Sequence, residues 1–302
     1  MNPIRKYPFR TGTSVVEFEN RFPDSLSCLE HIFACRLGDN RSCSKCGMPT
    51  EFCKIKTANR YISKCCWDSP LYPLRDTIFS ATRIPLNIWF RAILYFTNSS
   101  SGIGPDFLHK QLGICAKASI RMCKLIREHL SSIDDDIRLG RESNLVYLAE
   151  TTMKGVSRRG SKSRVRFRIL MATDGIEFLV LPIATGKFVQ SRDLLLDRLD
   201  QHASIITRTS ELKRKILNFK SFSRVKGRII EVAEDPDHLQ FYHLIACGIA
   251  LKRFILNSHY WVSEQHLASY LGHFAFLYRR RQRGSTAFWD AVSIFPKFQH
   301  CP

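Results

Sequence analysis

The spacing of hydrophobic side chains changes near residue 134 of this chain. Before that point apolar residues recur every three or four positions, a period that predicts amphipathic helices. The predicted helices span 14–35, 85–96, 105–112 and 117–130. The stretch 39–73 lacks this period and is rich in Cys, Ser and Pro. The first part of the chain is therefore predicted to be helical, with one irregular insertion.

The acidic run Asp134-Asp135-Asp136 predicts a linker, and strand-like patterns follow it. Strands are predicted at 145–148, 164–171, 177–184 and 203–207. The turn Thr173-Asp174-Gly175 favours a hairpin between the second and third of them. Helices are predicted at 192–200, 241–254 and 263–281. A hairpin-led sheet followed by helices indicates an α/β or α+β domain.

Charge points to the class of partner. The chain of 302 residues has 46 Lys and Arg against 27 Asp and Glu, a net charge of +19. Such a balance favours a polyanion, with nucleic acid ahead of an anionic membrane surface or a ribosome. No apolar run approaches the roughly 20 residues of a membrane span, and the N-terminus MNPIRKYPFR lacks the apolar core of a signal peptide. We therefore expect a cytoplasmic protein with no membrane partner.

Cysteines crowd the first part of the chain, where seven of the eleven lie within 66 residues. In a reducing cytosol this crowding suggests metal binding rather than disulfides. Cys43-Ser-Lys-Cys46-Gly47 has the spacing of a zinc knuckle, and Gly47 permits the tight turn. Three further cysteines, Cys115, Cys123 and Cys247, lie in apolar surroundings and are expected to be buried.

Cys65 and Cys66 are the expected second pair of zinc ligands, after a gap of 18 residues between Cys46 and Cys65. Adjacent cysteines are unusual partners on one metal, and a regular pair would need cysteine at Ser63. Cys53 is an alternative fourth ligand, and a metal-free remnant of a ribbon is an alternative to the whole site. The predicted cofactor is structural zinc.

The helices 105–112 and 117–130, separated by Gly113, have the layout of a helix-turn-helix. Polar and basic residues on the second helix of such a pair can contact base edges and phosphates. The residues predicted to contact DNA there are Lys117, Ser119, Arg121, Lys124 and Arg127. The run Arg279-Arg280-Arg281 is predicted to contact phosphate as well. An ordinary helical hairpin is the alternative for this pair.

Taken together, these segments resemble a family of bacterial insertion-sequence transposases. The resemblance is carried by 18–46, 76–90, Leu112-Gly113, Ile126-Arg127, 260–267 and 274–281. It implies an α/β fold, with a ribonuclease-H-like mixed sheet and flanking helices preceded by a zinc ribbon and a helix-turn-helix-like segment. The implied domains are a helical extension at 1–38, the ribbon at 39–76, the DNA-binding segment at 77–136 and the ribonuclease-H-like domain at 143–302.

Members of this family use three carboxylates, the DDE set, to hold two Mg²⁺ ions for phosphoryl transfer. The positions that the resemblance assigns to these carboxylates are Ala149, Arg208 and Ile245 here. Glu150 cannot replace an acid at 149, because one step along a strand reverses the face. The interval 238–263 contains no acid at all. Magnesium is therefore not expected, unless Glu150, Asp174 and Asp193 form a different cluster.

The sequence thus predicts a transposase-like, double-stranded-DNA-binding protein that has lost catalysis and acts at the bacterial nucleoid. The sequence does not determine the oligomeric state, and a homo-oligomer is compatible with it. An active Mg²⁺-dependent transposase with displaced ligands is one alternative. A zinc-ribbon RNA-binding protein is another.

Overall fold

The computed structural model describes residues 12–39, 41–43, 45–55, 58–142, 144–156, 164–183, 188–212, 230–232, 238–258, 262–283 and 287–298. It divides the chain into two compact units. The first contains Met1–Ser99, Pro105–His129 and Gly284–Pro302, and the second contains Ser100–Gly104 and Leu130–Arg283. This division differs from the predicted domains, since 1–38, 39–76 and most of 77–136 share one unit with the end of the chain.

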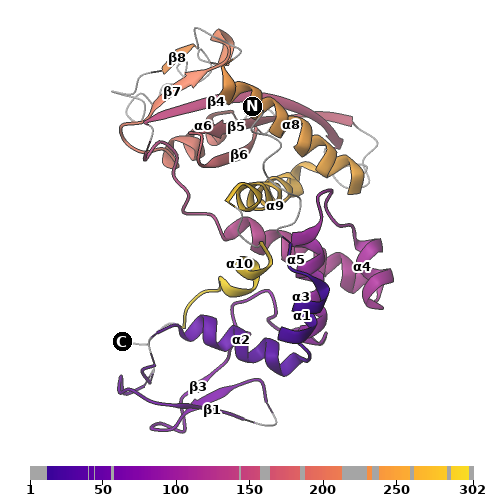
Figure 1. Ribbon diagram of the computed structural model, residues 1–302, viewed down its shortest axis with the longest axis vertical. Coiled ribbons are helices and arrows are strands. Elements are labelled where there is room, and N and C mark those ends of the chain that lie inside the picture. The colour runs from indigo at the N-terminus through magenta and orange to yellow at the C-terminus, as the bar shows by residue number, and fades with distance from the viewer. Residues whose placement is uncertain are drawn as a thin grey trace. The chain divides into compact units, whose positions relative to one another are not determined.

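The first unit is mainly helical (Figure 1). Its helices are α1 (Val15–Arg21), α2 (Ser25–Leu37), α3 (Leu86–Asn98), α4 (Pro105–Leu112), most of α5 (Ala116–Ser132), and α10 (Ala287–Ser293). The single helix predicted at 14–35 is in fact two helices. Pro23 cannot continue a helix, and Asp24 begins the next one by accepting a 2.7 Å hydrogen bond from the Ser27 amide.

Helix α10, which the sequence did not predict, completes the aromatic core of the first unit. Phe288 is fully buried, and its ring centroid lies 5.8 Å from that of Phe18 and 6.1 Å from that of Phe22. Phe22 also makes an edge contact with Phe90 of α3, with ring centroids 4.9 Å apart. The last helix of the chain is therefore part of the same core as the first.

A small antiparallel sheet lies in the segment predicted to be a ribbon. It has the order β1-β2-β3, with β1 at Phe52–Lys54, β2 at Tyr61–Ser63 and β3 at Pro70–Leu71. The ring of Tyr61 stacks on that of Phe33 in α2, with 3.7 Å between centroids. This stacking joins the sheet to the helical core.

The second unit is a mixed sheet flanked by helices, as predicted (Figure 1). The strand order is β6-β5-β4-β7-β8, with β4, β5 and β6 antiparallel and β7 and β8 parallel to β4. The strands are β4 (Leu145–Val156), β5 (Arg164–Thr173), β6 (Phe178–Ile183), β7 (Ser204–Thr207) and β8 (Ile230–Val232). The helices are α6 (Phe188–Asp197), α8 (Leu239–Ser258) and α9 (Glu264–Arg283).

The two faces of β4 meet different partners, because successive side chains on a strand point to opposite sides. Leu148 belongs to a buried cluster that includes Leu195 of α6. Tyr147 lies on the opposite face and packs against Phe241 of α8, with ring centroids 5.6 Å apart. Ala149 shares the face of Tyr147 that meets α8, whereas Glu150 shares the face of Leu148.

Helix α8 packs closely on this face. A Cβ at Gly248 would lie 3.5 Å from Thr151 Oγ1. The stretch Leu239–Leu256 also has the length and apolar composition of a membrane span, contrary to the expectation that no apolar run approaches one. Core helices share those properties, and one side of α8 is buried through Phe241, Leu244, Cys247 and Leu251.

Candidate functional site

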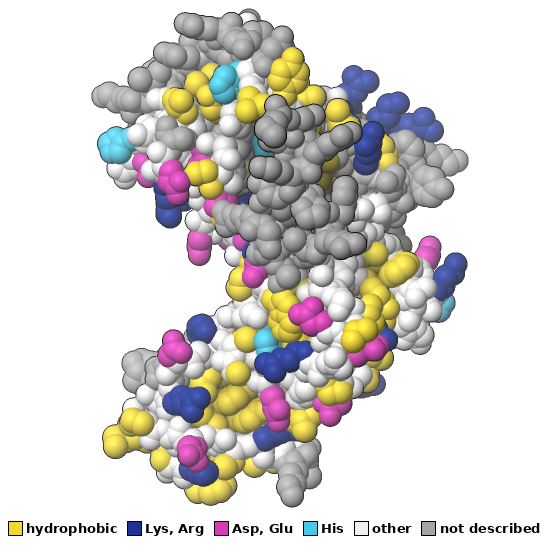
Figure 2. Space-filling model, in the orientation of Figure 1, with side chains coloured by type: hydrophobic (Ala, Val, Ile, Leu, Met, Phe, Trp, Pro, Cys, Tyr) yellow, Lys and Arg dark blue, Asp and Glu magenta, His cyan; other side chains and the backbone are white. Residues whose placement is uncertain are grey.

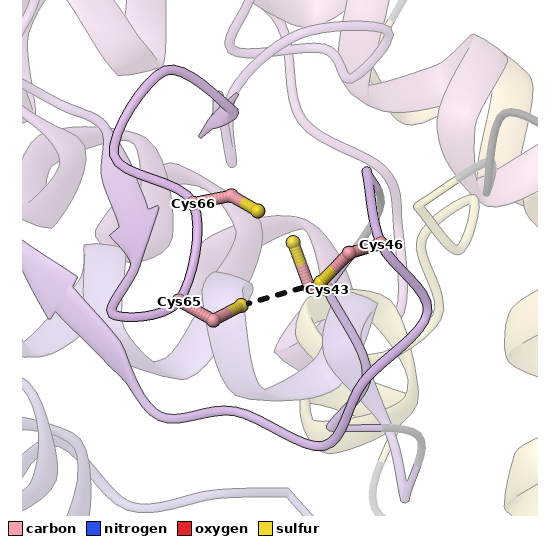
Figure 3. Close-up of side chains that lie close together, drawn as sticks. All are labelled: Cys43, Cys46, Cys65 and Cys66. Carbon is pink, nitrogen blue, oxygen red and sulfur yellow. Dashed lines mark hydrogen bonds between the residues drawn. The ribbon is translucent and has the colours of Figure 1, made fainter.

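Four cysteine sulfurs meet beside the small sheet of the first unit. The Sγ atoms of Cys43, Cys46, Cys65 and Cys66 all lie within 4.8 Å of one another (Figure 3). The Sγ atoms of Cys46 and Cys65 are 3.6 Å apart. Four sulfurs at about 2.3 Å from a tetrahedral zinc would be about 3.8 Å from each other. The predicted ligands are thus brought together, in an arrangement that could hold a metal ion.

Local backbone bonds shape the first pair of this cluster. The Cys43 amide donates to the carbonyl of Met48 at 2.8 Å, and the Gly47 amide donates to the carbonyl of Cys43 at 2.9 Å. Gly47 has a φ of 70°, a left-handed conformation that glycine adopts without strain. The turn therefore directs the sulfurs of Cys43 and Cys46 toward the same point.

The second pair follows the end of β2, where the chain turns. Cys65 and Cys66 both direct their sulfurs at the cluster despite being adjacent (Figure 3). Ser63, at the position of a regular ligand, still contributes: its hydroxyl lies 3.3 Å from Cys43 Sγ and donates to the carbonyl of Cys66 at 2.9 Å. Cys53 pairs with Ile62 in the sheet and is not one of the four.

The electrostatics of the cluster favour a cation. The hydrogen bond with Ser63 lowers the pKa of Cys43 to about 6. The neighbouring sulfurs, Cys46 first, raise the pKa of Cys66 to about 12. One thiol ionises readily while another is held protonated, because four thiolates this close repel one another. A bound metal cation would remove that repulsion and stabilise all four thiolates.

The other described cysteines are separate from this cluster. Burial raises the pKa of Cys123 and of Cys247 to about 11, as expected for thiols enclosed by apolar side chains. Cys115 was predicted to be buried and is exposed, because it lies in the turn between α4 and α5.

The helices α4 and α5 form the predicted pair. Gly113 joins them with a φ of 64°, and His109 Nδ1 lies 2.6 Å from the carbonyl oxygen of Ile114. The side chains of Lys117, Arg121 and Lys124 are exposed on α5. Their spacing of four and three places them on one face of the helix. This basic face is defined by these three residues.

Two other residues predicted to contact DNA on α5 lie on its inner side, which corrects that prediction. Ser119 is fully buried, and its hydroxyl donates to the carbonyl of Ala116 at 2.8 Å. Arg127 is buried too, with its guanidinium carbon 5.7 Å from the ring centroid of Phe96. The helical period sends both side chains toward the core of the first unit.

The arginines of α9 also fail the predicted role. Arg279 and Arg280 are buried and share the carboxylate of Asp134, with Arg280 Nη1 2.6 Å from Asp134 Oδ2. Arg279 Nη1 also donates to the carbonyl of Phe178 at 2.7 Å. These two side chains are buried and ion-paired inside the second unit, so they do not present an exposed phosphate-binding surface. The side chain of Arg281 lies outside the described residues.

Asp134 was assigned only to a linker by the sequence. Burial would raise its pKa, but the hydrogen bonds and charges of Arg280 and Arg279 outweigh burial and lower the pKa below its usual value of 3.8. No local pattern reveals such a partnership, because the acid and its partners are 145 and 146 residues apart.

Ala149, Arg208 and Ile245, the three positions assigned to metal-binding carboxylates, line a single pocket of about 250 Å³ in the second unit. They come from β4, from the residue after β7, and from α8. Among the described residues that line this pocket, the only acid is Glu150. Its carboxylate is held by Arg168, whose Nη2 donates to Glu150 Oε2 at 2.7 Å.

The alternative acidic cluster is not formed. Within the described ranges, the only grouping of three or more possible metal ligands is the cysteine cluster. Asp174 instead stabilises the hairpin turn, accepting from the amides of Gly140, Ile176 and Glu177 at 2.8, 3.0 and 2.8 Å.

Protein-family models, curated proteins and solved structures were compared with this chain, and none of them matches it. The function therefore has to be inferred from the geometry of its sites.

Proposed function

We propose that this chain is a transposase-derived protein that binds duplex DNA and does not cut or join it. The observation that carries this proposal is the convergence of Ala149, Arg208 and Ile245 in one pocket. These positions were chosen from the resemblance alone, and they lie up to 96 residues apart, from 149 to 245. Their meeting in one place supports the ancestry, and their side chains account for the loss of catalysis.

The topology of the second unit supports the same origin. Three antiparallel strands lie beside two parallel ones, in the order β6-β5-β4-β7-β8. The resemblance implies a ribonuclease-H-like mixed sheet, and a mixed sheet of this order is compatible with that fold. Here β4 is the central strand and carries Ala149.

The chemistry of the pocket argues against a two-metal reaction. Mg²⁺ prefers hard carboxylate and water oxygens, and alanine, arginine and isoleucine provide none. Lys252 of α8 adds a second positive charge to the lining. Glu150 is held by Arg168 and leaves no free carboxylate there. A pair of Mg²⁺ ions would therefore face repulsion rather than coordination.

The basic face of α5 is the proposed DNA contact. Lys117, Arg121 and Lys124 are exposed on the second helix of a pair whose turn of three residues contains Gly113. Lys and Arg side chains are also spread over both units in the view of Figure 2, consistent with the net charge of +19. This charge would draw the protein to the phosphate backbone of the bacterial nucleoid.

We assign the cysteine cluster to structural zinc. Zinc is commonly bound by four thiolates in small ribbons, and four protein ligands leave no open position for a substrate. The metal would tie the turn at Cys43 and Cys46 to the end of β2 at Cys65 and Cys66.

The test is duplex binding as a function of salt. Replacing Lys117, Arg121 and Lys124 by Ala removes three phosphate contacts and should weaken binding about tenfold or more at low salt. The slope of log K against log salt should become shallower by roughly 2.7, at about 0.9 per contact. Electrophoretic or fluorescence titrations of a duplex of about 30 base pairs would measure both the affinity and its salt dependence.

The matched control replaces Arg21, Arg41 and Arg83, three exposed basic residues of the same unit, by Ala. It removes the same charge away from α5 and should leave the slope nearly unchanged. Equal losses in both triple variants would refute a specific contact through α5. Tighter binding to structured RNA than to duplex DNA would favour the zinc-ribbon RNA-binding alternative.

A further inference from the structure

The pocket beside Ala149 lies just beyond the end of β7, next to the middle of β4. Strand β7 pairs with β4 only from Leu145 to Leu148 and ends at Thr207, whereas β4 continues to Val156. In the sheet, β4 lies between β5 on one side and β7 on the other, and β8 lies on the far side of β7. In open α/β sheets, ligands bind in the crevice beyond the carboxyl ends of parallel strands, and here β7 ends at the pocket.

Two cations line this crevice without a described counter-ion. Arg208 directly follows β7 and is exposed, and Lys252 projects from α8 and is partly buried. Within the part of the chain that the structure describes, neither side chain forms an ion pair or a hydrogen bond. Two positive groups on one pocket call for an anionic ligand.

The nearby acids are directed at another cation. Glu150 is bound by Arg168 through two hydrogen bonds, and the charge of Glu211 also acts on Arg168. An adjoining pocket contains Glu150, Arg168 and Glu211 together with Lys252. The acids therefore offset Arg168, and the charges of Arg208 and Lys252 remain available to a ligand.

Hydroxyl groups complete the lining. Thr151 and Thr209 both contribute to the pocket. The Thr209 hydroxyl oxygen accepts from the Leu212 amide at 3.3 Å, which leaves its proton free to donate elsewhere. Thr151 Oγ1 lies beside Gly248 on the floor formed by β4 and α8. The pocket thus offers cations and hydroxyl donors together.

We propose that this pocket binds a phosphate group directly, without a divalent metal. The guanidinium of Arg208 is planar and can donate two parallel hydrogen bonds to phosphate oxygens, with Lys252 as a point charge beside it. The position that holds metal in the resembling family would here hold the phosphate itself. The phosphate could belong to a DNA backbone or be free phosphate, because both share this chemistry. Only the first of these sources rests on the proposed function.

The first arm of the test titrates the full chain with inorganic phosphate in the presence of EDTA, by calorimetry or phosphorus NMR. The Arg208→Ala/Lys252→Ala variant should lose at least tenfold in phosphate affinity. The control Lys154→Ala/Arg253→Ala changes two exposed cations on β4 and α8, outside the pocket, and should bind as the wild type does. Arg208→Lys keeps the charge but loses the paired hydrogen bonds, and should bind phosphate with an affinity between that of the wild type and that of the double variant.

Three results would overturn the proposal: no phosphate binding by the wild type, equal loss in the control, or binding that EDTA abolishes. The last result would instead indicate a metal site. A second arm measures duplex binding by the same variants. A loss confined to Arg208→Ala/Lys252→Ala identifies backbone phosphate as the source, and unchanged duplex binding with lost phosphate binding identifies free phosphate.

The two proposals can fail separately. If the chain binds inorganic phosphate through Arg208 and Lys252 but does not bind duplex DNA, the pocket stands and the DNA-binding function falls. If duplex binding depends on the basic face of α5 while phosphate does not bind, the function stands and the pocket falls.

Discussion

Asp134 has a different role in the structure from the one that its sequence neighbours indicate. It stands in a run of three acids between two halves of the sequence, yet it forms ion pairs with two buried arginines of α9. Buried ion pairs of this kind are balanced against the cost of removing both charges from water. Removing one partner is therefore costly, because the remaining charge stays buried.

We expect Asp134→Asn to destabilise the second unit by about 3–5 kcal/mol, since it removes the carboxylate that two buried guanidinium groups share. Urea unfolding would measure the change. Asp136→Asn, an exposed neighbour in the same run, is the control and should change stability by no more than about 0.5 kcal/mol. A similar effect of both substitutions would contradict the assignment.

The same pair makes a pH prediction. The pKa of Asp134 is lower in the folded protein than its usual 3.8. Its stabilising contribution is therefore fully present above that usual value and is lost as the pH falls through the lower, folded pKa. Between about pH 5 and pH 2 the free energy of unfolding of the wild type should fall, and Asp134→Asn should make this fall smaller.

Basic residues on helices explain why only some of the residues predicted to contact DNA are exposed. A basic side chain on a helix can face solvent or reach a buried partner, and its sequence neighbours do not distinguish the two. Lys117, Arg121 and Lys124 are exposed, whereas Arg127 lies on the inner side of the same helix. The arginines of α9 turned inward because Asp134, far away in sequence, meets them there.

At the scale of elements, the ribbon was largely predictable. The knuckle at Cys43 and Cys46 is a local motif, and a second pair was expected a short distance beyond it. The adjacent cysteines Cys65 and Cys66 were the expected second pair, and the structure brings both sulfurs to the cluster because the chain turns after β2. Elements that form through distant contacts were missed: β8 has three residues and α10 has seven, too few for a clear period.

We predict about one zinc per chain. The Cys43→Ser/Cys46→Ser variant should lose the zinc and also the ordered structure of roughly residues 40–70, because metal binding and local folding are coupled. Elemental analysis under reducing conditions and limited proteolysis would measure these losses. Cys53→Ser/Cys115→Ser removes two thiols outside the cluster and should retain the metal. Wild-type protein purified without zinc would exclude the site.

At the scale of the whole molecule, the change of hydrophobic period correctly marked where the mixed sheet begins, and the flanking helices were expected. The division into units was not, because the packing of 287–293 on the first helices is a long-range contact with no local signal. The pocket beside Ala149 could be placed only through the resemblance, since alanine, arginine and isoleucine suggest no joint chemistry by themselves.

The full chain should neither nick nor join supercoiled DNA with Mg²⁺ or Mn²⁺, because its pocket offers two cations where metal ligands would be needed. Agarose-gel assays of plasmid topology would test this. Glu150→Gln should leave the inactive protein unchanged in duplex binding. Metal-dependent nicking that Glu150→Gln abolishes would instead identify an active transposase with displaced ligands.

The placement of α10 also has a consequence for biosynthesis. Phe288 belongs to the core formed with Phe18 and Phe22, so a nascent chain cannot complete that core until residue 288 has left the ribosome. Domains usually fold in the order of their synthesis. Here the second unit, which ends at Arg283, can finish first. The segments made earliest must wait for the last helix, with their aromatic residues exposed to chaperones in the meantime.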